Sequence, residues 1–264
     1  MFLSTSDSGS HVFVSPHLDD AVLSCGGVIA ELSRRQATVI VATIFAGEPV
    51  TFSPLAAALH AKWNLDHSIS KRKAEDVSAC ARIGATVRHL DFFDAIYRSD
   101  PNKDGIRYPS IESLYNSPSR LDDSLLLELG ECLRAMFIEL VPRAVYSPAA
   151  VGSHVDHVLA KRSVHLALAD IEEMIQKPDL YLYEDLPYSA RSGSLVEFPN
   201  LLSSTPTLSR DAKRRKVEAI KEYRSQLDML WPSGRIDEEL TRHSNRLAPE
   251  VAYTERFWQV SQRG

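Results

Sequence analysis

The chain has 264 residues, of which 44% are hydrophobic and 25% are charged, and its formal net charge is −5. This length and composition fit one globular α/β domain over residues 1–264, and the acidic balance argues against a dedicated nucleic-acid-binding protein. Neither a signal peptide nor a membrane-spanning stretch is evident, so we expect a cytoplasmic protein without a membrane span. Three isolated cysteines fit buried thiols in a reducing compartment: Cys25, Cys80 and Cys132.

The first predicted strand, at about residues 11–15, leads directly into a candidate site. Pro16 ends this strand because proline cannot donate to a sheet ladder, and a helix is expected over about 20–36. In open α/β sheets, binding sites lie at the carboxyl ends of the strands. The segment between the strand and the helix contains three metal-competent side chains: His17, Asp19 and Asp20.

The helix at about 20–36 contains two consecutive glycines, Gly26 and Gly27, which predict close packing against the sheet. They do not form a dinucleotide-binding fingerprint, because the Gly-x-Gly-x-x-Gly spacing is absent. The continuous apolar run at 38–45 then predicts a buried strand. Residues 46–66 are expected to form a loop or a short helix.

Arg72 lies near the start of the next predicted helix, where it belongs either to a salt-bridged surface or to a substrate pocket. A strand at 87–90 precedes a polar connection over about 91–120. This connection is long for a compact domain, and such loops are commonly functional. It is either a specificity loop, with Tyr97 and Tyr108 available to stack on a sugar, or a surface insertion packed by its own aromatic residues.

A second candidate site repeats the layout of the first. A helix over about 122–140 leads to a strand at 144–147, which Pro148 ends, and the segment His154-Val155-Asp156-His157 then opens another helix. Two possible ligands again lie three residues apart, on one face if the turn is helical. Two such segments at the ends of two strands are stronger evidence for a site than either segment alone.

The last predicted strand, at 180–183, ends in two acids, Glu184 and Asp185. They lie where the sheet presents its site, so we expect one of them to bind substrate or a ligand amine. Residues 211–231 predict an amphipathic helix, and its basic run at 213–216 is expected to form a solvated face.

These segments resemble the LmbE/PIG-L family of metal-dependent N-deacetylases, which carries a Pro-His-Pro-Asp-Asp-Glu-like motif after its first strand and a His-Pro-Asp-His motif after a later one. The resemblance covers the chain from the first strand to about residue 230. It implies a Rossmann-like three-layer αβα sandwich with a mostly parallel sheet. Leu18, Ala21 and Val155 depart from the family pattern, but none of them replaces a metal-binding or catalytic residue. The matching segments are Pro16-His17-Leu18-Asp19-Asp20-Ala21 and His154-Val155-Asp156-His157.

Four candidate ligands are present: His17, Asp20, His154 and His157. A catalytic zinc usually has three protein ligands and one open position, and spacing alone does not select three of the four. The resemblance implies that His17, Asp20 and His157 are the metal ligands. It also implies that Asp19, His154 and Asp156 act on the substrate. We expect Asp19 to be the general base, His154 to hold the oxyanion, and Asp156 to fix the tautomer of His154 and favour its charged form; either Asp19 or His154 then protonates the departing amine.

The residues and the resemblance together predict a zinc-dependent hydrolase that removes an N-acetyl or other N-acyl group from an amino sugar or a glycosylated small metabolite. Such a donor set also accepts Fe²⁺, Co²⁺ or Mn²⁺. The alternative is a non-catalytic Rossmann-like module that binds a sugar or nucleotide and needs no metal. The sequence is compatible with a homo-oligomer and predicts no nucleic-acid partner. The predicted substrate contacts are Arg72, Tyr97, Tyr108, Glu184 and Asp185.

Overall fold

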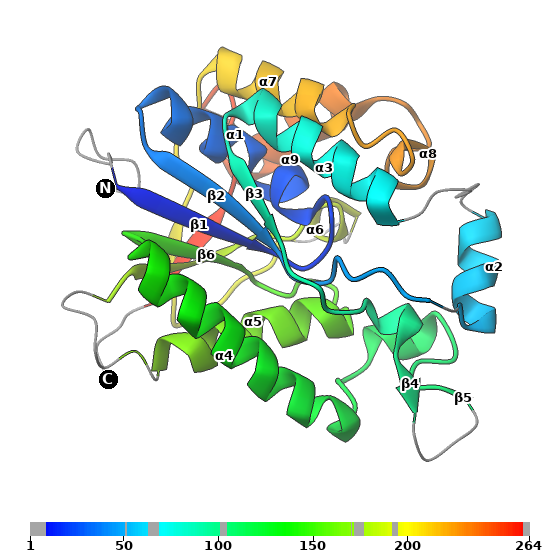
Figure 1. The fold of residues 1–264 in the computed structure, drawn as a ribbon. Coiled ribbons are helices and arrows are strands. Elements are labelled where there is room, and N and C mark those ends of the chain that lie inside the picture. Colours follow the sequence, from blue (N-terminus) through cyan, green and yellow to red (C-terminus); the bar gives the residue numbers. More distant parts are fainter. Residues whose placement is uncertain are drawn as a thin grey trace.

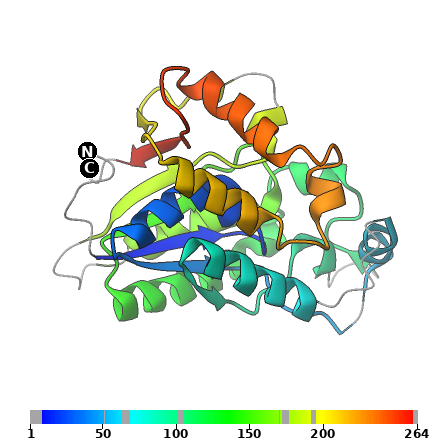
Figure 2. The ribbon, with the colours of Figure 1, turned by 90° about the horizontal axis from the view of Figure 1, so that it is seen from above.

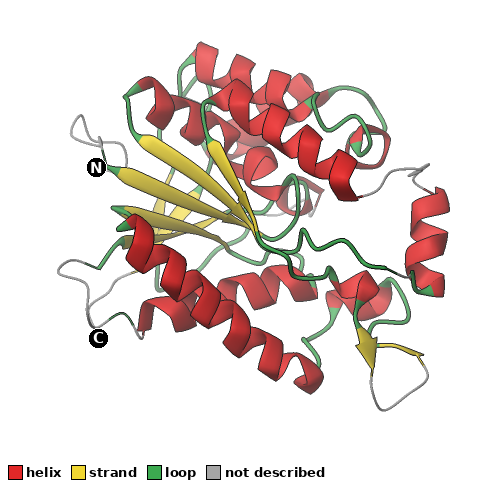
Figure 3. Cartoon of the chain, viewed as in Figure 1, coloured by secondary structure: helices red, strands yellow, loops and turns green. Residues whose placement is uncertain are grey.

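The computed structural model describes residues 9–50, 52–62, 69–100, 105–169, 171, 177–191 and 195–260. In this part of the chain, a seven-stranded, mostly parallel sheet lies between two layers of helices (Figure 1 and Figure 3). The predicted three-layer α/β fold is confirmed. The strands of the sheet are β1 (Ser10–Ser15), β2 (Thr38–Thr43), β3 (Thr86–His89), β6 (Ala144–Pro148), β7 (Asp179–Tyr183), β8 (Leu202–Ser204) and β9 (Phe257–Val260).

The helices that cover the sheet and the short elements around its carboxyl edge alternate with these strands. The α-helices are α1 (Asp20–Arg34), α2 (Pro54–Lys62), α3 (Ile69–Ile83), α4 (Asp123–Leu140), α5 (Val155–Ala169), α6 (Tyr188–Arg191), α7 (Arg210–Ile220), α8 (Leu227–Leu230) and α9 (Ile236–Leu247). The segment after β3 contains η1 (Ala95–Tyr97), a hairpin of β4 (Ser99–Asp100) and β5 (Gly105–Ile106), η2 (Glu112–Tyr115) and η3 (Arg120–Asp122).

The order of the strands in the sheet is β3-β2-β1-β6-β7-β9-β8. The five strands from β3 to β7 are parallel, whereas β9 runs antiparallel to both of its neighbours. The chain winds outward from β1 to β3 and then returns to place β6 on the other side of β1. The strand order therefore reverses between β1 and β6, and open α/β sheets bind ligands at such a switch point.

The side chains of β1 alternate between two cores. Phe13 packs in a cluster with α1, α3 and α7, whereas Val12 and Val14 pack with α4 and α5. Figure 1 shows these two groups of helices on opposite sides of the sheet, and Figure 2 shows α3 and α7 side by side on one face. Successive strand residues point to opposite faces, so a strand covered on both faces is apolar at nearly every position.

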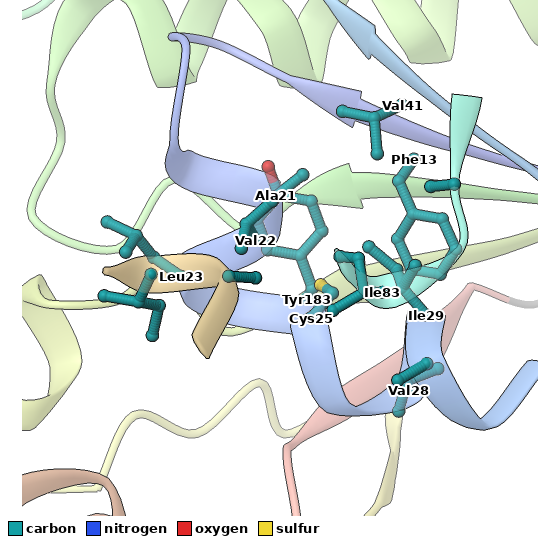
Figure 4. Close-up of a cluster of buried hydrophobic side chains, with 14 of the residues drawn as sticks. Phe13, Ala21, Val22, Leu23, Cys25, Val28, Ile29, Val41, Ile83 and Tyr183 are labelled. Atoms are coloured by element: carbon teal, nitrogen blue, oxygen red, sulfur yellow. The ribbon is translucent and has the colours of Figure 1, made fainter. Parts of the chain in front are cut away.

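Helix α1 is the centre of the first core and is buried along nearly its whole length. Figure 4 shows three of its apolar residues, Val22, Cys25 and Ile29, in one cluster with Phe13 of β1 and Tyr183 of β7. Burial of one such aliphatic side chain stabilises the fold by roughly 1.5–3 kcal/mol. This packing fixes α1, and with it the turn that precedes α1, against the end of β1.

The prediction that the two glycines of α1 pack against the sheet is wrong, because they face α7 and the segment before β9. A Cβ on Gly26 would lie 2.8 Å from Cγ of Lys216, and a Cβ on Gly27 would lie 2.8 Å from Oε1 of Glu255. Lys216 was predicted on a solvated face, but it is fully buried and its Nζ donates to Glu255 at 2.7 Å. The absence of side chains at Gly26 and Gly27 leaves room beside α1 for this ion pair between α7 and the segment before β9.

The carboxyl-terminal third departs most from the sequence-based prediction. The helix expected over 211–231 ends at Ile220 in α7 and is followed by a turn before α8. Strands β8 and β9 carried no clear sequence signal, because they are only three and four residues long. Helix α9 was missed, although it has acids in its first turn and a buried apolar face. Phe257 and Trp258 of β9 are inaccessible to solvent, so pairing with β7 buries this short strand in the sheet.

Candidate active site

The first motif lies in the turn between β1 and α1. Oγ of Ser15 donates to the carbonyl of His17 at 2.7 Å and accepts from the backbone N–H of Ala21 at 3.0 Å. The carboxylate of Asp20 accepts from the backbone N–H of His17 at 2.8 Å. These bonds fix the turn so that Nδ1 of His17 and Oδ2 of Asp20 lie 3.1 Å apart.

The second motif lies between β6 and α5, at the strand next to β1. The loop turns sharply, with positive φ values at Ala150 (63°), Gly152 (86°) and Ser153 (59°). It places His154 just before α5, and Asp156 and His157 in its first turn. Because β1 and β6 are adjacent, the two motifs meet at the switch point of the sheet.

Three side chains from the two motifs converge in a cluster. Ligand atoms of His17, Asp20 and His157 lie within 4.8 Å of one another. Nε2 of His157 is buried 3.3 Å from Oδ2 of Asp20, without hydrogen-bond geometry and without another partner among the described residues. An unpaired buried nitrogen costs free energy of folding. We call His17, Asp20 and His157 the metal cluster, because a cation bound between them would pair with this nitrogen.

Each histidine of the metal cluster donates a hydrogen bond to a buried carboxylate from the ring nitrogen that does not face Asp20. Nδ1 of His157 donates to Asp185 at 2.7 Å, and Nε2 of His17 donates to Asp156 at 3.0 Å. The opposite nitrogens, Nε2 of His157 and Nδ1 of His17, face Asp20 and would present lone pairs to a cation bound there. Metal-binding histidines are commonly oriented in this way, and two imidazoles with one carboxylate fit zinc or a similar divalent cation.

The electrostatics of the metal cluster favour positive charge. Burial lowers the pKa of His157, but the carboxylates of Asp20 and Asp185 outweigh this effect and raise it to about 9. Burial likewise opposes the effect of Asp94 and Asp20 on His17, whose pKa rises to about 9. The surrounding carboxylates therefore stabilise a cation at this point.

Asp156 occupies a different place from the predicted one. Its carboxylate accepts from Nε2 of His17, from Arg98 and from the backbone N–H of Ala95 at 3.0 Å. Among the described residues, the hydrogen bond of the His154 imidazole comes from the backbone of Asp156, whose N–H donates to Nδ1 at 3.3 Å. The prediction that the Asp156 carboxylate fixes the tautomer of His154 is therefore wrong. A second possible ligand group that includes Asp156 is less suitable, because three donors already occupy this carboxylate.

Asp19 and His154 line the adjoining pocket. Burial and the charge of Asp20 raise the pKa of Asp19 to about 6, against the opposing effect of Arg72, whose guanidinium lies 3.8 Å away. Burial and the nearby charge of His17 hold the pKa of His154 well below its ordinary value, which contradicts the predicted charged form. Since Nδ1 of His154 accepts a hydrogen bond, Nε2 carries the proton. Asp19 can thus exchange a proton near neutral pH, and neutral His154 can donate a hydrogen bond.

The pocket beside the metal cluster has a volume of about 170 Å³. Its polar lining combines the first motif with residues of α3 and the segment after β3, and its other walls are largely apolar or aromatic. The polar and charged lining residues include His17, Asp19, Asp20, His60, Arg72, Asp94, His154 and Gln226. The apolar and aromatic lining residues include Leu59, Ile69, Ile96, Tyr97, Ile111, Leu114, Tyr115, Tyr188, Met229 and Leu230.

Two of the predicted substrate contacts from the middle of the chain line this pocket and a third does not. Arg72 and Tyr97 are part of the lining, and the hydroxyl of Tyr97 lies 2.7 Å from Nε2 of His60. Tyr108 is buried inside the segment after β3, where its hydroxyl donates to Asp122. Both predictions for this segment, a specificity loop and an insertion packed by its own aromatic residues, are therefore partly correct. Some of its aromatic residues line the pocket, whereas Tyr108 packs inside the segment.

The two acids after β7 lie outside the pocket lining. Glu184 is buried and accepts from Nε2 of His243 at 2.9 Å and from Arg256 at 2.5 Å. Asp185 is buried behind the metal cluster and accepts from His157. Both carboxylates are occupied by protein donors, which argues against the predicted substrate contacts.

Several pocket residues were missed by sequence reasoning. Asp94 lies 3.5 Å from Nε2 of His17. Its position shortly after the end of β3 was the sequence feature that could have identified it. His60 had no partner at ligand spacing, and its pairing with Tyr97 arises only in the fold. Tyr188 was also missed, and its ring contacts His157. It also contacts Tyr115, a tyrosine of the 91–120 segment that was expected to be available for stacking and that contacts His154.

A family model described as PIG-L, GlcNAc-PI de-N-acetylase, matches residues 12–168, which contain both motifs and the metal cluster. The chain belongs to the PIG-L family. Two curated relatives are named 2′-N-acetylparomamine deacetylase. The one from Niallia circulans is 31% identical over 197 residues, covering 69% of this chain and 68% of the relative. The one from Streptomyces fradiae is 29% identical over 250 residues, covering 91% and 80%.

Solved structures support the same membership in the PIG-L family. A deacetylase of the teicoplanin biosynthesis pathway matches with a TM-score of 0.84 and 30% identity, covering 97% of this chain and 100% of its own. The A40926 pseudoaglycone deacetylase matches with a TM-score of 0.81 and 31% identity, covering 98% and 99%. A 4-carboxy-2-hydroxymuconate hydratase, at 18% identity and a TM-score of 0.60, shares the fold alone. Within the described ranges, no helix has the length and apolar character needed to cross a membrane.

Proposed function

We propose that this chain is a metal-dependent N-deacetylase that releases acetate from an N-acetylated amino sugar within a small glycosylated molecule. The observation that carries the proposal is the position of Asp19, which lines the pocket directly beside the metal cluster of His17, Asp20 and His157. The relatives named above act, by their names, on 2′-N-acetylparomamine and on the A40926 pseudoaglycone, and another is a deacetylase of the teicoplanin biosynthesis pathway. An aminoglycoside or glycopeptide intermediate is therefore the proposed substrate class.

In this mechanism, the cation held by the metal cluster would supply the Lewis acidity that activates water and polarises an amide carbonyl. Zinc is the proposed cation, because two imidazoles and one carboxylate are a common zinc ligand set. Asp19 takes the proton of the attacking water, a role that suits a carboxylate whose pKa is raised to about 6. It then returns this proton to the departing amine, so that acetate and a free amino sugar are the products.

His154 is proposed to stabilise the oxyanion of the tetrahedral intermediate. It is neutral and carries its proton on Nε2, and donors fixed in advance at the position of developing charge lower the barrier most effectively. The backbone N–H of Asp156 fixes this tautomer, and the ring of Tyr115 packs edge-on against the imidazole, with centroids 5.4 Å apart. The hydrogen-bond donor is thus oriented by the backbone and by an aromatic neighbour rather than by a carboxylate.

Residues 91–120 are proposed to determine specificity within a single catalytic domain. The described part of this segment contributes Asp94, Ile96, Tyr97, Ile111, Leu114 and Tyr115 to the pocket. In Figure 1 the β4–β5 hairpin and α2 stand together at the carboxyl end of the parallel strands. The apolar and aromatic side chains suit the non-polar faces of sugar rings or an aromatic aglycone.

The proposal is tested by measuring bound metal and amine release together. Wild-type protein and the Asp19→Asn and His157→Ala variants are analysed for metal content and assayed on N-acetylparomamine and other N-acetylated amino sugars. We expect Asp19→Asn to retain metal but to lose about 10²–10⁴-fold in kcat. We expect His157→Ala to lose both metal and activity. His165→Ala is the matched control, because His165 is exposed on the same helix and should keep both.

The outcomes separate the deacetylase from the alternative, a non-catalytic sugar-binding module. If wild-type protein binds no divalent metal after reconstitution, the deacetylase proposal is refuted. If Asp19→Asn keeps full activity, the assignment of the base is refuted. Sugar binding that survives both substitutions, without amine release from any member of the panel, would favour the binding module.

A further inference from the structure

A second cleft, with a volume of about 70 Å³, lies between α6 and α9, which are labelled in Figure 1. Pro187 lines both this cleft and the active-site pocket. Leu230 lines the pocket, and the next residue, Trp231, lines the cleft. The two cavities therefore lie on opposite sides of one thin wall. The cleft residues that matter here are Arg191, Trp231, Arg242, His243 and Arg246.

The cleft gathers three guanidiniums against one lining carboxylate, that of Glu239. Arg242 and Arg246 lie one turn apart on α9, where like charges repel, and Arg191 of α6 faces the same space. In the described part of the chain, none of the three guanidiniums has a carboxylate oxygen within 4.0 Å. Glu239 also lines the cleft, but it accepts a hydrogen bond from Ser233 at 2.6 Å.

Two of these arginines are held in place by backbone carbonyls. Arg191 donates to the carbonyl of Leu230 at 2.6 Å, and Arg246 donates to that of Ser189 at 3.4 Å. A guanidinium has five N–H donors in a fixed fork, so each arginine keeps further donors for a ligand. Fixed guanidiniums with free donors are suited to bind a carboxylate.

His243 adds a buried imidazole to the same cleft. Its side chain is 7% exposed, and its Nε2 is held by Glu184, which Arg256 in turn fixes. Nδ1 of His243 is buried and has no hydrogen-bond partner among the residues that the structure describes. A neutral imidazole whose Nε2 donates to a carboxylate presents Nδ1 as an acceptor, so His243 forms part of the cleft wall and the donors for an anion are the guanidiniums.

The remaining walls of the cleft are apolar. Leu186, Trp231 and Leu240 line it, and each is nearly inaccessible to solvent. A free inorganic anion would leave this apolar surface unused, whereas an anion attached to an alkyl or aromatic group would bury against it. The ligand that fits both features is an organic carboxylate.

We propose that this cleft binds a carboxylate carried on an apolar group, through the guanidiniums of Arg191, Arg242 and Arg246. The carboxylate belongs either to a distal part of the substrate, which reaches over Pro187 from the active site, or to a separate small molecule. The first source rests on the proposed deacetylase function. The second source does not.

The binding itself is tested by calorimetry on the full chain, with phenylacetate as the probe and phenylacetamide as its neutral counterpart. We expect phenylacetate to bind, and the Arg242→Gln, Arg246→Gln double variant to bind it about tenfold more weakly, because charged donors are removed. We expect phenylacetamide to bind wild type about tenfold more weakly as well. The Arg214→Gln, Lys221→Gln variant loses the same charge from exposed positions on and just after α7, whose ion-pair partners are Asp211 and Glu218, and it should bind like wild type.

The proposal is overturned if phenylacetate gives no binding heat, or if its affinity is the same in wild type and in the arginine double variant. Thermal melting checks that the double variant is folded. Arg242→Gln alone provides the measurement if it is not, because Arg242 is exposed on α9.

The two sources of the carboxylate are distinguished by kinetics on a 4-carboxyphenyl N-acetylglucosaminide and its methyl ester. A KM about tenfold lower for the acid in wild type, but equal for both in the double variant, identifies the carboxylate as part of the substrate. Equal KM values with arginine-dependent phenylacetate binding identify a separate small molecule. If neither compound is turned over while phenylacetate still binds, the proposed deacetylase activity is in doubt and the carboxylate cleft stands.

Discussion

Asp185 and Glu184 are adjacent in the sequence, yet the structure predicts opposite effects on metal binding when each is neutralised. Asp185 accepts from Nδ1 of His157 at 2.7 Å and from the backbone N–H of Val151 at 2.9 Å. It is 1% exposed, so water cannot replace a lost bond. Glu184 instead binds His243, away from the metal cluster. We expect Asp185→Asn to weaken zinc binding and Glu184→Gln to leave it nearly unchanged.

The expected loss of zinc affinity in Asp185→Asn follows from the number of hydrogen-bond acceptors at position 185. An asparagine at position 185 has one carbonyl oxygen for the two donors of His157 and Val151, so one hydrogen bond is lost and an amide N–H₂ faces the other donor. Loss of such a carboxylate behind a metal-binding histidine typically reduces metal affinity about 10–100-fold. This corresponds to roughly 1.4–2.8 kcal/mol of binding free energy.

The assay is a zinc titration in competition with a chromophoric chelator, at one pH and for all three proteins. Glu184→Gln is the matched control, because it removes one negative charge from the neighbouring residue. Equal zinc affinities for Asp185→Asn and wild type would refute the orienting role of Asp185. Equal losses in both variants would show that the effect is one of total charge, and the geometric reasoning would then fail.

Three further predictions concern residues away from the metal cluster. Glu255→Gln should lower the free energy of unfolding by about 3–5 kcal/mol in denaturant titrations, because it leaves Lys216 buried without its partner; a loss below 1 kcal/mol would contradict this. Although burial raises the pKa of Glu184, its histidine and arginine partners outweigh that effect and hold the pKa below the ordinary value. Its contribution to stability should therefore be complete above the unfolded pKa of about 4.3 and be lost as the pH falls through the lower folded pKa. Urea titrations between pH 3 and 6 should show that the free energy of unfolding falls less steeply with acid in Glu184→Gln than in wild type. Parallel curves for the two proteins would argue against this role of Glu184. Tyr108→Phe should leave KM unchanged and cost roughly 1–3 kcal/mol of stability, because Asp122 loses a buried donor; a raised KM with unchanged stability would restore Tyr108 as a substrate contact.

The strands with continuous apolar runs could be predicted because both of their faces are buried. β1 and β2 follow the expected ranges closely, since a strand covered by helices on both sides must be apolar at nearly every position. β9 could not be predicted in this way. It has four residues, and it is a strand because β7 offers an edge for antiparallel pairing rather than because of its own composition.

The positions of the two motifs were also evident in the sequence. A proline after each strand and a helical pattern after each motif place His17 and His157 at strand ends, and strand ends are where sheets of this class bind ligands. The family resemblance added the choice of ligands, which spacing alone left open.

The sequence by itself therefore determined the fold class, the location of the candidate site and the residue types that meet there, because these depend on local periodicity and on short motifs. Only the tertiary structure decided which carboxylate holds which histidine. Asp156 supports His17, and Asp185 supports His157 from 28 residues farther along the chain. The physical reason is that a hydrogen bond is set by distance and direction between side chains from different elements, and no local pattern encodes how those elements pack.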